Sequence, residues 1–333
     1  MNWALIGAST IASQYMIDAI RAQPDAEVTA VLSSNALRGR DYAARHDIGQ
    51  AYTDLDELLA DASIEGVYIS TTNEKHYPQA MAAIAAGKHV MCEKPLAMTL
   101  VEAADMVAAA EKAGLVFGTN HHLRNAGSHM AIREAIAQGR VGEVQSVRIG
   151  HAVMLPPNLQ GWRIDNPAAG GGVIPDIVVH DADTVRFHLN EDPTEVVAIA
   201  RSDSLGQGVE DSVMSVWQMQ SGAMVQTHEG FTIRYAGTSF EVHGTEGSIV
   251  ARNVMTQQPV GEVILRKEGS EEPLSFSDHN LYGRSMGLFM DAVAGKGAPS
   301  ATGIDGVKSL AVALAVKDAA TSGQRVAVDY EGL

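Results

Sequence analysis

Short apolar runs alternate with stretches of helical spacing over the first 120 residues of the chain. The apolar runs are residues 3–6, 27–32, 66–70, 89–92 and 116–119. Between them lie amphipathic or alanine-rich stretches at residues 11–21, 37–45, 55–59, 77–86 and 100–113. Continuous apolar strands separated by helices are typical of a parallel sheet that is covered on both faces. Right-handed crossovers then predict a doubly wound α/β domain of the Rossmann type.

The pattern changes after residue 120, where strands become frequent. Predicted strands cover residues 144–153, 195–202, 212–220, 223–231, 238–242, 248–253 and 262–266, and predicted helices cover residues 174–189, 285–294 and 304–320. The tight connection at residues 220–222 favours antiparallel pairing of the strands beside it. We therefore predict a Rossmann domain over residues 1–120. Residues 121–333 are predicted to form an α+β domain for substrate binding or oligomerisation, with a large, mostly antiparallel open sheet.

Composition narrows the classes of protein to consider. Hydrophobic residues make up 46% of the 333 residues and charged residues 19%, which is ordinary globular usage. The formal net charge of -16 argues against a partner with a nucleic-acid backbone. No run of about 18 apolar residues occurs, so we expect no membrane span. The single cysteine, Cys92, and an N-terminus without a signal-peptide pattern favour the cytoplasm.

The first candidate site is the turn after the first strand. It reads Gly7-Ala8-Ser9-Thr10-Ile11-Ala12, whereas the dinucleotide fingerprint has glycine at its first, third and sixth positions. Ser9 departs from that pattern, while Ala12 is still small enough for helix–strand packing. The free N–H groups of a helix N-terminus favour a pyrophosphate, and an ordinary strand-to-helix turn is the alternative. The predicted cofactor contacts here are Gly7, Ser9, Thr10, Ile11 and Ala12.

The end of the second strand indicates which dinucleotide would bind. A site that prefers NAD usually places a carboxylate there for the ribose 2′-hydroxyl. This chain instead has Ser33, Ser34 and Asn35, followed by Arg38 and Arg40. Hydroxyl and guanidinium groups suit a 2′-phosphate, so Ser33, Ser34 and Arg38 predict NADPH rather than NADH. A solvated helix face is the alternative for the two arginines.

Glu93-Lys94-Pro95 follows the predicted strand at residues 89–92. In a doubly wound fold the carboxyl ends of the strands face the ligand crevice. Because proline restricts the residue before it to extended backbone, the Lys94 ammonium would be directed into that crevice. A surface Glu-Lys pair at a strand end is the alternative.

A second polar motif lies on the predicted helix at residues 174–189. Asp176 and His180 are four residues apart and would share one face of that helix. His180 is a candidate proton donor because the ordinary pKa of histidine is near neutrality. Asp176 would orient the imidazole or hydrogen-bond the substrate. A satisfied polar pair in the core is the alternative reading of these two residues.

Several segments together resemble the glucose-fructose oxidoreductase, inositol dehydrogenase and rhizopine-catabolism family (Gfo/Idh/MocA). They are the Gly7 turn, STTNEKH at 70–76, AGKHVMCEKPLA at 86–97, GGGVIPDIVVHDAD at 170–183 and HGTEGS at 243–248. The resemblance covers nearly the whole chain and implies an oxidoreductase with a cis peptide bond before Pro95. It implies cofactor contacts from Thr71, Thr72, Asn73, His76, Glu93 and Lys94, and catalytic roles for Lys94, Asp176 and His180.

Within this family, GASTIA, SSNALR, STTNEKH, QGWR and VHDAD are most similar to a reductase of sugar ketones. That similarity implies hydride transfer from NADPH to C2 of 1,5-anhydro-D-fructose, which gives 1,5-anhydro-D-mannitol. The proton would come from His180 or Lys94. One alternative is an NAD(P)-dependent inositol or sugar dehydrogenase of the same family. Another is a cofactor-binding regulator that has lost catalysis.

Other polar groups complete the predictions. Asn120, Trp162, Arg163 and Tyr282 are candidates for lining the cofactor and sugar site. The histidines and aspartates at 121, 122, 129, 181 and 183 match no zinc template, and hydride transfer needs no metal, so we predict no metal site. One face of the hairpin at 212–231 carries Ser212, Gln218, Gln220, Gln226 and His228, which suits a solvated face. A monomer and a homo-oligomer both stay open.

Overall fold

The computed structural model describes residues 1–330 of the chain, and these residues form two compact units. The first unit contains Met1–His122 and a later segment, Tyr282–Val307. The second contains Leu123–Leu281 and the chain from Lys308 onward. The path of the chain therefore enters the first unit twice, and each unit is built from two separate stretches of sequence.

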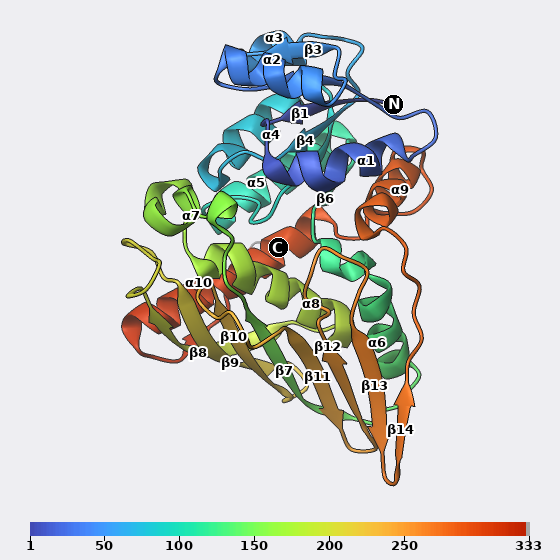
Figure 1. The fold of residues 1–333 in the computed structure, drawn as a ribbon, viewed down its shortest axis with the longest axis vertical. Helices are drawn as coiled ribbons and strands as arrows, with labels where there is room; N and C mark the ends of the chain where they lie inside the picture. The colour runs from blue at the N-terminus through green and yellow to red at the C-terminus, as the bar shows by residue number, and fades with distance from the viewer. Residues whose placement is uncertain (331–333) are drawn as a thin grey trace. The chain divides into compact units, whose positions relative to one another are not determined.

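The first unit is built on a six-stranded sheet in which every neighbouring pair is parallel (Figure 1). Its strands are β1 (Asn2–Ile6), β2 (Glu27–Leu32), β3 (Gln50–Tyr52), β4 (Gly66–Ile69), β5 (His89–Cys92) and β6 (Phe117–Thr119). Their order is β3-β2-β1-β4-β5-β6. This is the Rossmann order, in which the chain reverses direction across the sheet between β1 and β4, so the predicted fold class is confirmed for this unit.

Helices connect these strands. They are a π-helical turn Ala12–Met16 that continues into α1 (Ile17–Arg21), α2 (Ala36–Arg45), α3 (Leu55–Leu59), a 3₁₀ turn Asn73–Lys75 that continues into α4 (His76–Ala85), and α5 (Leu100–Ala113). Local sequence sets their ends. Thr99 and Glu102 form a capping box at the start of α5, and Gly114 ends it in the left-handed conformation, with φ of 68°.

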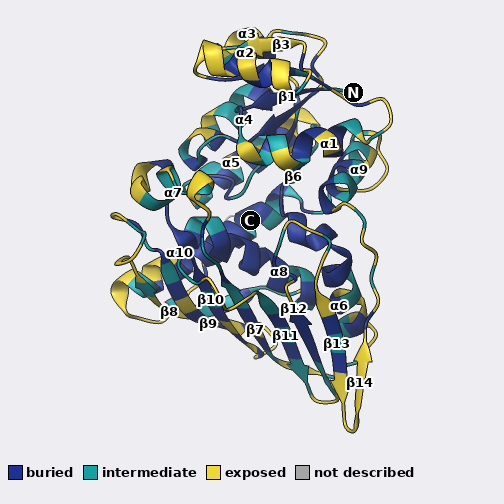
Figure 2. Ribbon diagram, in the orientation of Figure 1, coloured by how far each residue is buried: buried dark blue, intermediate teal, exposed yellow. Residues whose placement is uncertain are grey.

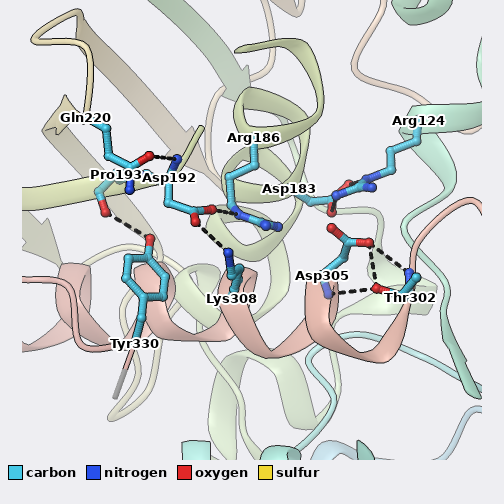
Figure 3. Close-up of polar contacts among 10 residues, drawn as sticks. All are labelled: Arg124, Asp183, Arg186, Asp192, Pro193, Gln220, Thr302, Asp305, Lys308 and Tyr330. Carbon is cyan, nitrogen blue, oxygen red and sulfur yellow. Dashed lines mark hydrogen bonds and ion pairs between the residues drawn. The ribbon is translucent and has the colours of Figure 1, made fainter. Parts of the chain in front are cut away.

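The returning segment packs against the core of the first sheet. Helix α9 (Leu281–Val293) brings Phe289 to the Trp3 ring, with ring centroids 5.4 Å apart. Further along, the Thr119 hydroxyl donates to the carbonyl oxygen of Thr302 over 3.0 Å. The Thr302 hydroxyl in turn binds the Asp305 carboxylate at the start of α10 (Gly303–Ser322) (Figure 3). The edge of the sheet at β6 is therefore completed by residues almost 200 positions later.

The second unit is built on a nine-stranded sheet in the order β14-β13-β12-β11-β7-β10-β9-β8-β15. Its strands are β7 (Val144–Ala152), β8 (Pro193–Arg201), β9 (Ser212–Met219), β10 (Met224–Gly230), β11 (Ser239–Gly244), β12 (Ser248–Arg252), β13 (Glu262–Lys267), β14 (Ser270–Pro273) and β15 (Val326–Ala327). All described pairs are antiparallel except β7 with β10. The predicted mostly antiparallel sheet is confirmed.

Hydrophobic spacing did not reveal every helix of the second unit. The helices are α6 (Gly127–Ala137), α7 (Trp162–Asp165), a π-helical turn Ile174–Val178 that continues into α8 (Val179–Leu189), and the part of α10 from Lys308 onward. Short 3₁₀ turns occupy Pro157–Leu159 and Pro167–Ala169, and another, His122–Asn125, carries the chain from the first unit to the second. Helix α6 was not predicted. No helix within residues 1–330 is long and apolar enough to cross a membrane.

Helix α8 is almost entirely buried in the second unit (Figure 2). Charged groups fix its position on two sides. Arg124 approaches both carboxylate oxygens of Asp183 at 2.7 Å, and Arg186 and Lys308 each bind Asp192 at 2.6 Å (Figure 3). These pairs leave α8 little freedom to shift, because breaking a buried pair strands an uncompensated charge.

The faces of the nine-stranded sheet differ in burial. On β9, Val213, Ser215 and Trp217 are buried, and the residues between them point to the other face. That outer face carries the polar residues expected there, but it also carries exposed apolar side chains: Val197, Ile199, Met214, Val216 and Met224. The outer face is thus mixed rather than polar throughout.

Candidate functional site

The turn after β1 lies against the end of β4, where the order of strands reverses. Gly7 has φ of +112°, and a Cβ atom there would lie 3.1 Å from the backbone carbonyl of Ser70 and from the Thr71 methyl group. Only glycine fits both constraints. The backbone of Gly7 therefore packs directly against the carboxyl end of β4, with no side chain between them. This is the place where open α/β sheets bind their ligands.

Ser9, which replaces the expected second glycine, has a defined local role. Its hydroxyl lies 2.7 Å from the Ser70 hydroxyl and accepts a 3.2 Å hydrogen bond from the N–H of Ala12. The side chain is thereby directed toward β4 and toward the first turn of the helix. The helix that follows begins with a π-helical turn, Ala12–Met16, a feature that is frequent at functional sites.

The end of β2 brings a cation to this turn. The Arg38 guanidinium donates a 2.6 Å hydrogen bond to the carbonyl oxygen of Ala8, and the Arg38 N–H donates to the Asn35 side chain that caps α2. Ser33 is buried, whereas Ser34 is exposed. The structure therefore joins the two predicted cofactor segments, residues 7–12 and 33–38, along one edge of the sheet.

A buried polar cluster lies at the ends of β4, β5 and β6. The Glu93 carboxylate accepts hydrogen bonds from the Tyr68 hydroxyl and, over 2.6 Å, from the Asn120 amide. Burial and the Glu93 charge raise the pKa of Tyr68 well above its ordinary value. Within residues 1–330 the Asn120 side-chain oxygen, though buried, has no hydrogen-bond partner. The Asn120 oxygen is therefore a buried acceptor without a donor, at the edge of the sheet where the cofactor is predicted to bind.

Tyr282 joins this cluster from the returning segment. Its ring is stacked between Tyr15, with centroids 4.8 Å apart, and His122, with centroids 5.3 Å apart. Burial and the nearby Glu93 charge raise the pKa of Tyr282 well above its ordinary value. The ring stack therefore fixes the Tyr282 ring in a position near the Glu93 carboxylate.

The Lys94–Pro95 peptide bond is cis, as the family resemblance implied. His76 holds the segment that contains it. The His76 ring is fully buried, with Nδ1 at 2.8 Å from the carbonyl oxygen of Pro95 and Nε2 at 3.3 Å from that of Thr71. Burial lowers the pKa of His76, while the two contacts with carbonyl oxygens act against that shift. His76 thus ties the loop after β4 to the loop after β5.

Two further residues of the predicted cofactor set bond within their own loop. The Thr71 hydroxyl donates to Gln79 over 2.6 Å, and the Thr72 hydroxyl donates to Glu74 over 2.8 Å. Asn73 is buried at the start of the 3₁₀ turn that precedes α4. The loop after β4 is therefore held by its own side chains, and it contributes the Thr71 methyl group that packs on Gly7.

In the second unit, Glu210 anchors the start of the helix that carries Asp176 and His180. The N–H of Val173 donates to the Glu210 carbonyl, and the N–H of Ile174 donates to its carboxylate over 3.3 Å. Gly172 has φ of +114°, and a Cβ atom there would lie 2.4 Å from that carboxylate. Sequence analysis did not identify Glu210, because it lies in a loop far from the motif it caps.

Asp176 lies in a π-helical turn, Ile174–Val178, and His180 lies in the α-helix that continues it. Because a π-turn has more than four residues per turn, a spacing of four nearly completes one turn, so the two side chains share a face. Asp176 pairs with Arg163 at 3.4 Å, and the Arg163 guanidinium lies over the Trp162 ring at 4.7 Å. The structure therefore brings Trp162, Arg163 and Asp176 together.

The His180 side chain lies close to a second histidine that sequence analysis did not consider. Ring centroids of His180 and His151 are 6.4 Å apart, and His151 Nδ1 lies 2.7 Å from a carboxylate oxygen of Asp181. His151 comes from β7 and Asp181 from α8, 30 residues later in the chain. Only the fold could place them in contact.

The histidines and aspartates considered for a metal site have other partners. His129 lies 3.0 Å from His188, Asp181 binds His151, and Asp183 binds Arg124. No group of three or more histidine, cysteine or carboxylate side chains within residues 1–330 is arranged to hold a metal ion.

Comparison with known proteins places the chain in a family. The model described as an oxidoreductase family with an NAD-binding Rossmann fold matches residues 1–121, and the GFO/IDH/MocA C-terminal domain matches residues 129–250. The 1,5-anhydro-D-fructose reductase of Ensifer adhaerens is 56% identical over 98% of both chains. The inositol 2-dehydrogenase of Rhizobium meliloti is 31% identical over 94% of both chains.

Solved structures share the same fold. The aldose-aldose oxidoreductase of Caulobacter crescentus, complexed with glycerol, superimposes with a TM-score of 0.90 at 24% identity and covers 98% of this chain and 99% of its own. A levoglucosan dehydrogenase in complex with NADH gives a TM-score of 0.87 at 23% identity over 99% of both chains. Motifs, fold and sequence identity agree, and this chain belongs to the GFO/IDH/MocA family of oxidoreductases with an NAD-binding Rossmann fold.

Proposed function

We propose that this protein reduces the C2 ketone of 1,5-anhydro-D-fructose to 1,5-anhydro-D-mannitol with NADPH. The observation that carries the proposal is the 56% identity, over 98% of both chains, to a 1,5-anhydro-D-fructose reductase. At that identity the substrate-facing residues are expected to be largely shared.

Two observations fit a bound dinucleotide in the first unit. Because Gly7 has no Cβ atom, the turn after β1 packs directly on Ser70 and Thr71 at the edge of the sheet where open α/β folds bind a dinucleotide. The buried Asn120 oxygen lacks a donor within residues 1–330, and a carboxamide N–H of the nicotinamide would supply one. Gly7, Ser9, Thr10, Ile11 and Ala12 would hold the phosphates, and Asn120 the nicotinamide end.

The end of β2 supports NADPH over NADH. Ser33 and Ser34 occupy the positions where a carboxylate would select the unphosphorylated ribose. Arg38 lies beside them, and its link to the Ala8 carbonyl holds a positive charge over the turn after β1. A guanidinium attracts and binds a 2′-phosphate, whereas a carboxylate would repel it.

The chemistry assigned to the protein residues is proton transfer and charge stabilisation. When bound, the reduced nicotinamide supplies the hydride. Lys94 polarises the substrate carbonyl as negative charge develops on its oxygen, which favours the transition state over the ground state. His180 or Lys94 gives the proton to that oxygen. Asp176, paired with the Arg163 guanidinium that lies over the Trp162 ring, orients the imidazole or a sugar hydroxyl.

Purified protein with NADPH and 1,5-anhydro-D-fructose tests the proposal. We expect NADPH oxidation and a product with the manno configuration, determined by NMR. Lys94→Ala and His180→Ala should each lower kcat by about 100-fold or more while NADPH affinity, measured by fluorescence titration, changes little. A protein that binds NADPH without turnover of any sugar ketone would instead be a cofactor-binding regulator. Faster oxidation of inositol with NAD would favour the dehydrogenase alternative.

A further inference from the structure

A chain of hydrogen bonds runs through the second unit beneath His180. Its members lie on β7, β9, β10 and α8, and all but His151 are buried: Trp217, Ser215, Thr227, Glu229, Asp181 and His151. His151 and Glu229 are direct neighbours across the parallel pair of β7 and β10. Both side chains therefore point to the face of the sheet on which α8 carries Asp181 and His180.

The direction of the hydrogen bond between Ser215 and Thr227 follows from Thr227, because its one hydroxyl hydrogen is donated to Glu229 and the Thr227 oxygen can then only accept from Ser215. The Trp217 indole N–H can only donate, and it donates to the Ser215 hydroxyl over 2.8 Å. The Ser215 hydroxyl then donates to that of Thr227 over 2.7 Å, and Thr227 donates to a Glu229 carboxyl oxygen over 3.0 Å. This series of hydrogen bonds thus supplies a donor to one carboxyl oxygen of Glu229. The other Glu229 oxygen is left for the interaction with Asp181.

The buried carboxyl groups of Glu229 and Asp181 interact with each other. Burial, the Asp181 charge and a hydrogen bond between the two carboxyl groups raise the pKa of Glu229 well above its ordinary value. A neutral Glu229 can donate to Asp181, and a carboxylate oxygen of Asp181 lies 2.7 Å from His151 Nδ1, where it can accept the Nδ1–H. The Asp181 carboxylate therefore fixes the His151 tautomer and stabilises a positive charge on that ring.

The second nitrogen of His151 is on the side of the ring away from Asp181. The His151 side chain is 12% exposed, and the His180 residue is 8% exposed, so His151 has some contact with solvent. The two ring centroids are 6.4 Å apart. In the directly hydrogen-bonded pair His129 and His188 the centroids are 5.2 Å apart. The extra distance of about 1 Å calls for one bridging water or a small ring rotation.

We propose that His151, oriented by Asp181, returns a proton to His180 after each reduction. This relay rests on the proposed function, in which His180 protonates the substrate oxygen. In the relay step the Nε2–H bond of His151 breaks and an N–H bond forms on His180. The positive charge moves with the proton, and His151 regains a proton from water. No electrons are transferred. His151 is a positioning and relay residue, since it acts through His180.

Every charged or titratable group around His151 bears on this transfer. Asp181 and His180 face it from α8, and Glu229 faces it from β10. His129 on α6 lies close enough for a charge on His151 to lower the pKa of His129. The Asp181 carboxylate lies 2.7 Å from the ring nitrogen Nδ1, so it is the group that orients His151 for the transfer.

His151→Gln tests the relay. The glutamine amide can still donate to Asp181, but it cannot titrate. With enzyme in excess over substrate, the first turnover uses the proton already on His180, so we expect its rate to stay within about two-fold of the wild type. Steady-state kcat should fall by about 10-fold or more, and this decrease should become larger as the pH rises. Added imidazole should restore kcat.

Two further variants make the result decisive. Asp181→Asn should lower steady-state kcat in the same way. His228→Gln is the matched control, because His228 lies on β10 of the same sheet but faces the outer side. Unchanged steady-state kcat in His151→Gln overturns the relay, and so does an equal loss in the first turnover without rescue by imidazole. If the wild type reduces no sugar ketone at all, the proposed function fails and the relay fails with it.

Discussion

The Arg38 guanidinium donates a 2.6 Å hydrogen bond to the carbonyl oxygen of Ala8. This contact joins the helix after β2 to the turn after β1, and it holds an exposed side chain in one place. An arginine fixed in this way loses little entropy when it binds a phosphate. Arg38 is therefore preorganised, whereas Arg40, two residues later in α2 and exposed, has no such contact within residues 1–330.

Arg38→Ala should reduce the preference for NADPH. We expect kcat/KM for NADPH to fall by about 10-fold to 100-fold, because a charge-assisted bidentate contact to phosphate is lost. The value for NADH should change by less than about three-fold. Arg40→Ala is the control and should leave the ratio of the two values unchanged. An unchanged ratio in Arg38→Ala would remove Arg38 from the cofactor site.

Gly172→Ala should lower both the stability of the second unit and the activity of the protein. The new methyl group would lie 2.4 Å from the Glu210 carboxylate, and the backbone there has φ of +114°. We expect a loss of about 2 kcal/mol or more in unfolding free energy and a fall in kcat of about 10-fold, because Asp176 and His180 shift. Chemical denaturation and steady-state kinetics measure the two effects.

Gly139→Ala separates backbone strain from steric overlap in that experiment. Gly139 also has a positive φ, +71°, but a Cβ atom there would meet nothing within 4 Å. It should cost about 1 kcal/mol of stability and leave kcat unchanged. If both variants lose activity equally, the Glu210 contact is not what positions the helix.

Acid should destabilise the second unit through His129 and His188. His129 Nε2 donates to the Val254 carbonyl, so its Nδ1 accepts the Nε2–H of His188. Burial lowers the pKa of His129 from 6.5 to about 4 and that of His188 as well. The folded state therefore resists protonation, while the unfolded state takes up protons below pH 6.5. Stability should fall by about 3 kcal/mol from His129 alone between pH 6.5 and pH 4.

His129→Gln checks this origin of the acid sensitivity. Glutamine keeps a donor for the Val254 carbonyl but cannot titrate. The slope of unfolding free energy against pH, measured by urea denaturation between pH 4 and pH 6.5, should decrease by about one proton. A slope equal to that of the wild type would assign the acid sensitivity to other groups.

Glu229 should make the stability of the protein depend on pH in the opposite direction, with a loss of stability at high pH. Its folded-state pKa is raised by burial and by Asp181, while in the unfolded chain it ionises near pH 4.5. The unfolded state then binds fewer protons than the folded state, so stability decreases as the pH rises above that value. Glu229→Gln should raise the melting temperature at pH 8 and have little effect near pH 4.5. Glu241→Gln on β11, whose side chain is partly exposed on the outer face, is the control and should show no such trend.

Hydrophobic patterning predicted most of the fold because the strands of both sheets are strongly marked. The five apolar runs of the first half are β1, β2, β4, β5 and β6, and the seven predicted strands of the second half all exist. Helix α6 was missed because its buried residues are mostly small or polar, namely Gly127, Ser128, His129 and Ala135, with Ile132 the one large apolar side chain among them. The parallel pairing of β7 with β10 was missed because no local signal records which distant strands become neighbours.

The candidate site was predicted where its residues are close in sequence. The Gly7 turn, the Ser33–Arg38 segment and the Asp176/His180 pair each sit within one short stretch, so turn geometry and helical spacing reveal them. Glu210 and His151 could not be found in this way. Each acts on the helix at 174–189 from an element more than 20 residues away, and each is an ordinary polar residue in its own stretch of sequence.

The return of residues 282–307 to the first unit bears on how the protein is made. Phe289 packs on Trp3, and Thr302 completes the edge of β6. A nascent chain that has emerged only as far as β6 would lack both, and the Trp3 side of its sheet would stay open to other hydrophobic surfaces. The nucleotide-binding unit should therefore finish folding only after residues 282–307 have been synthesised, so the first part of the chain to leave the ribosome must wait until residues 123–281 have followed it.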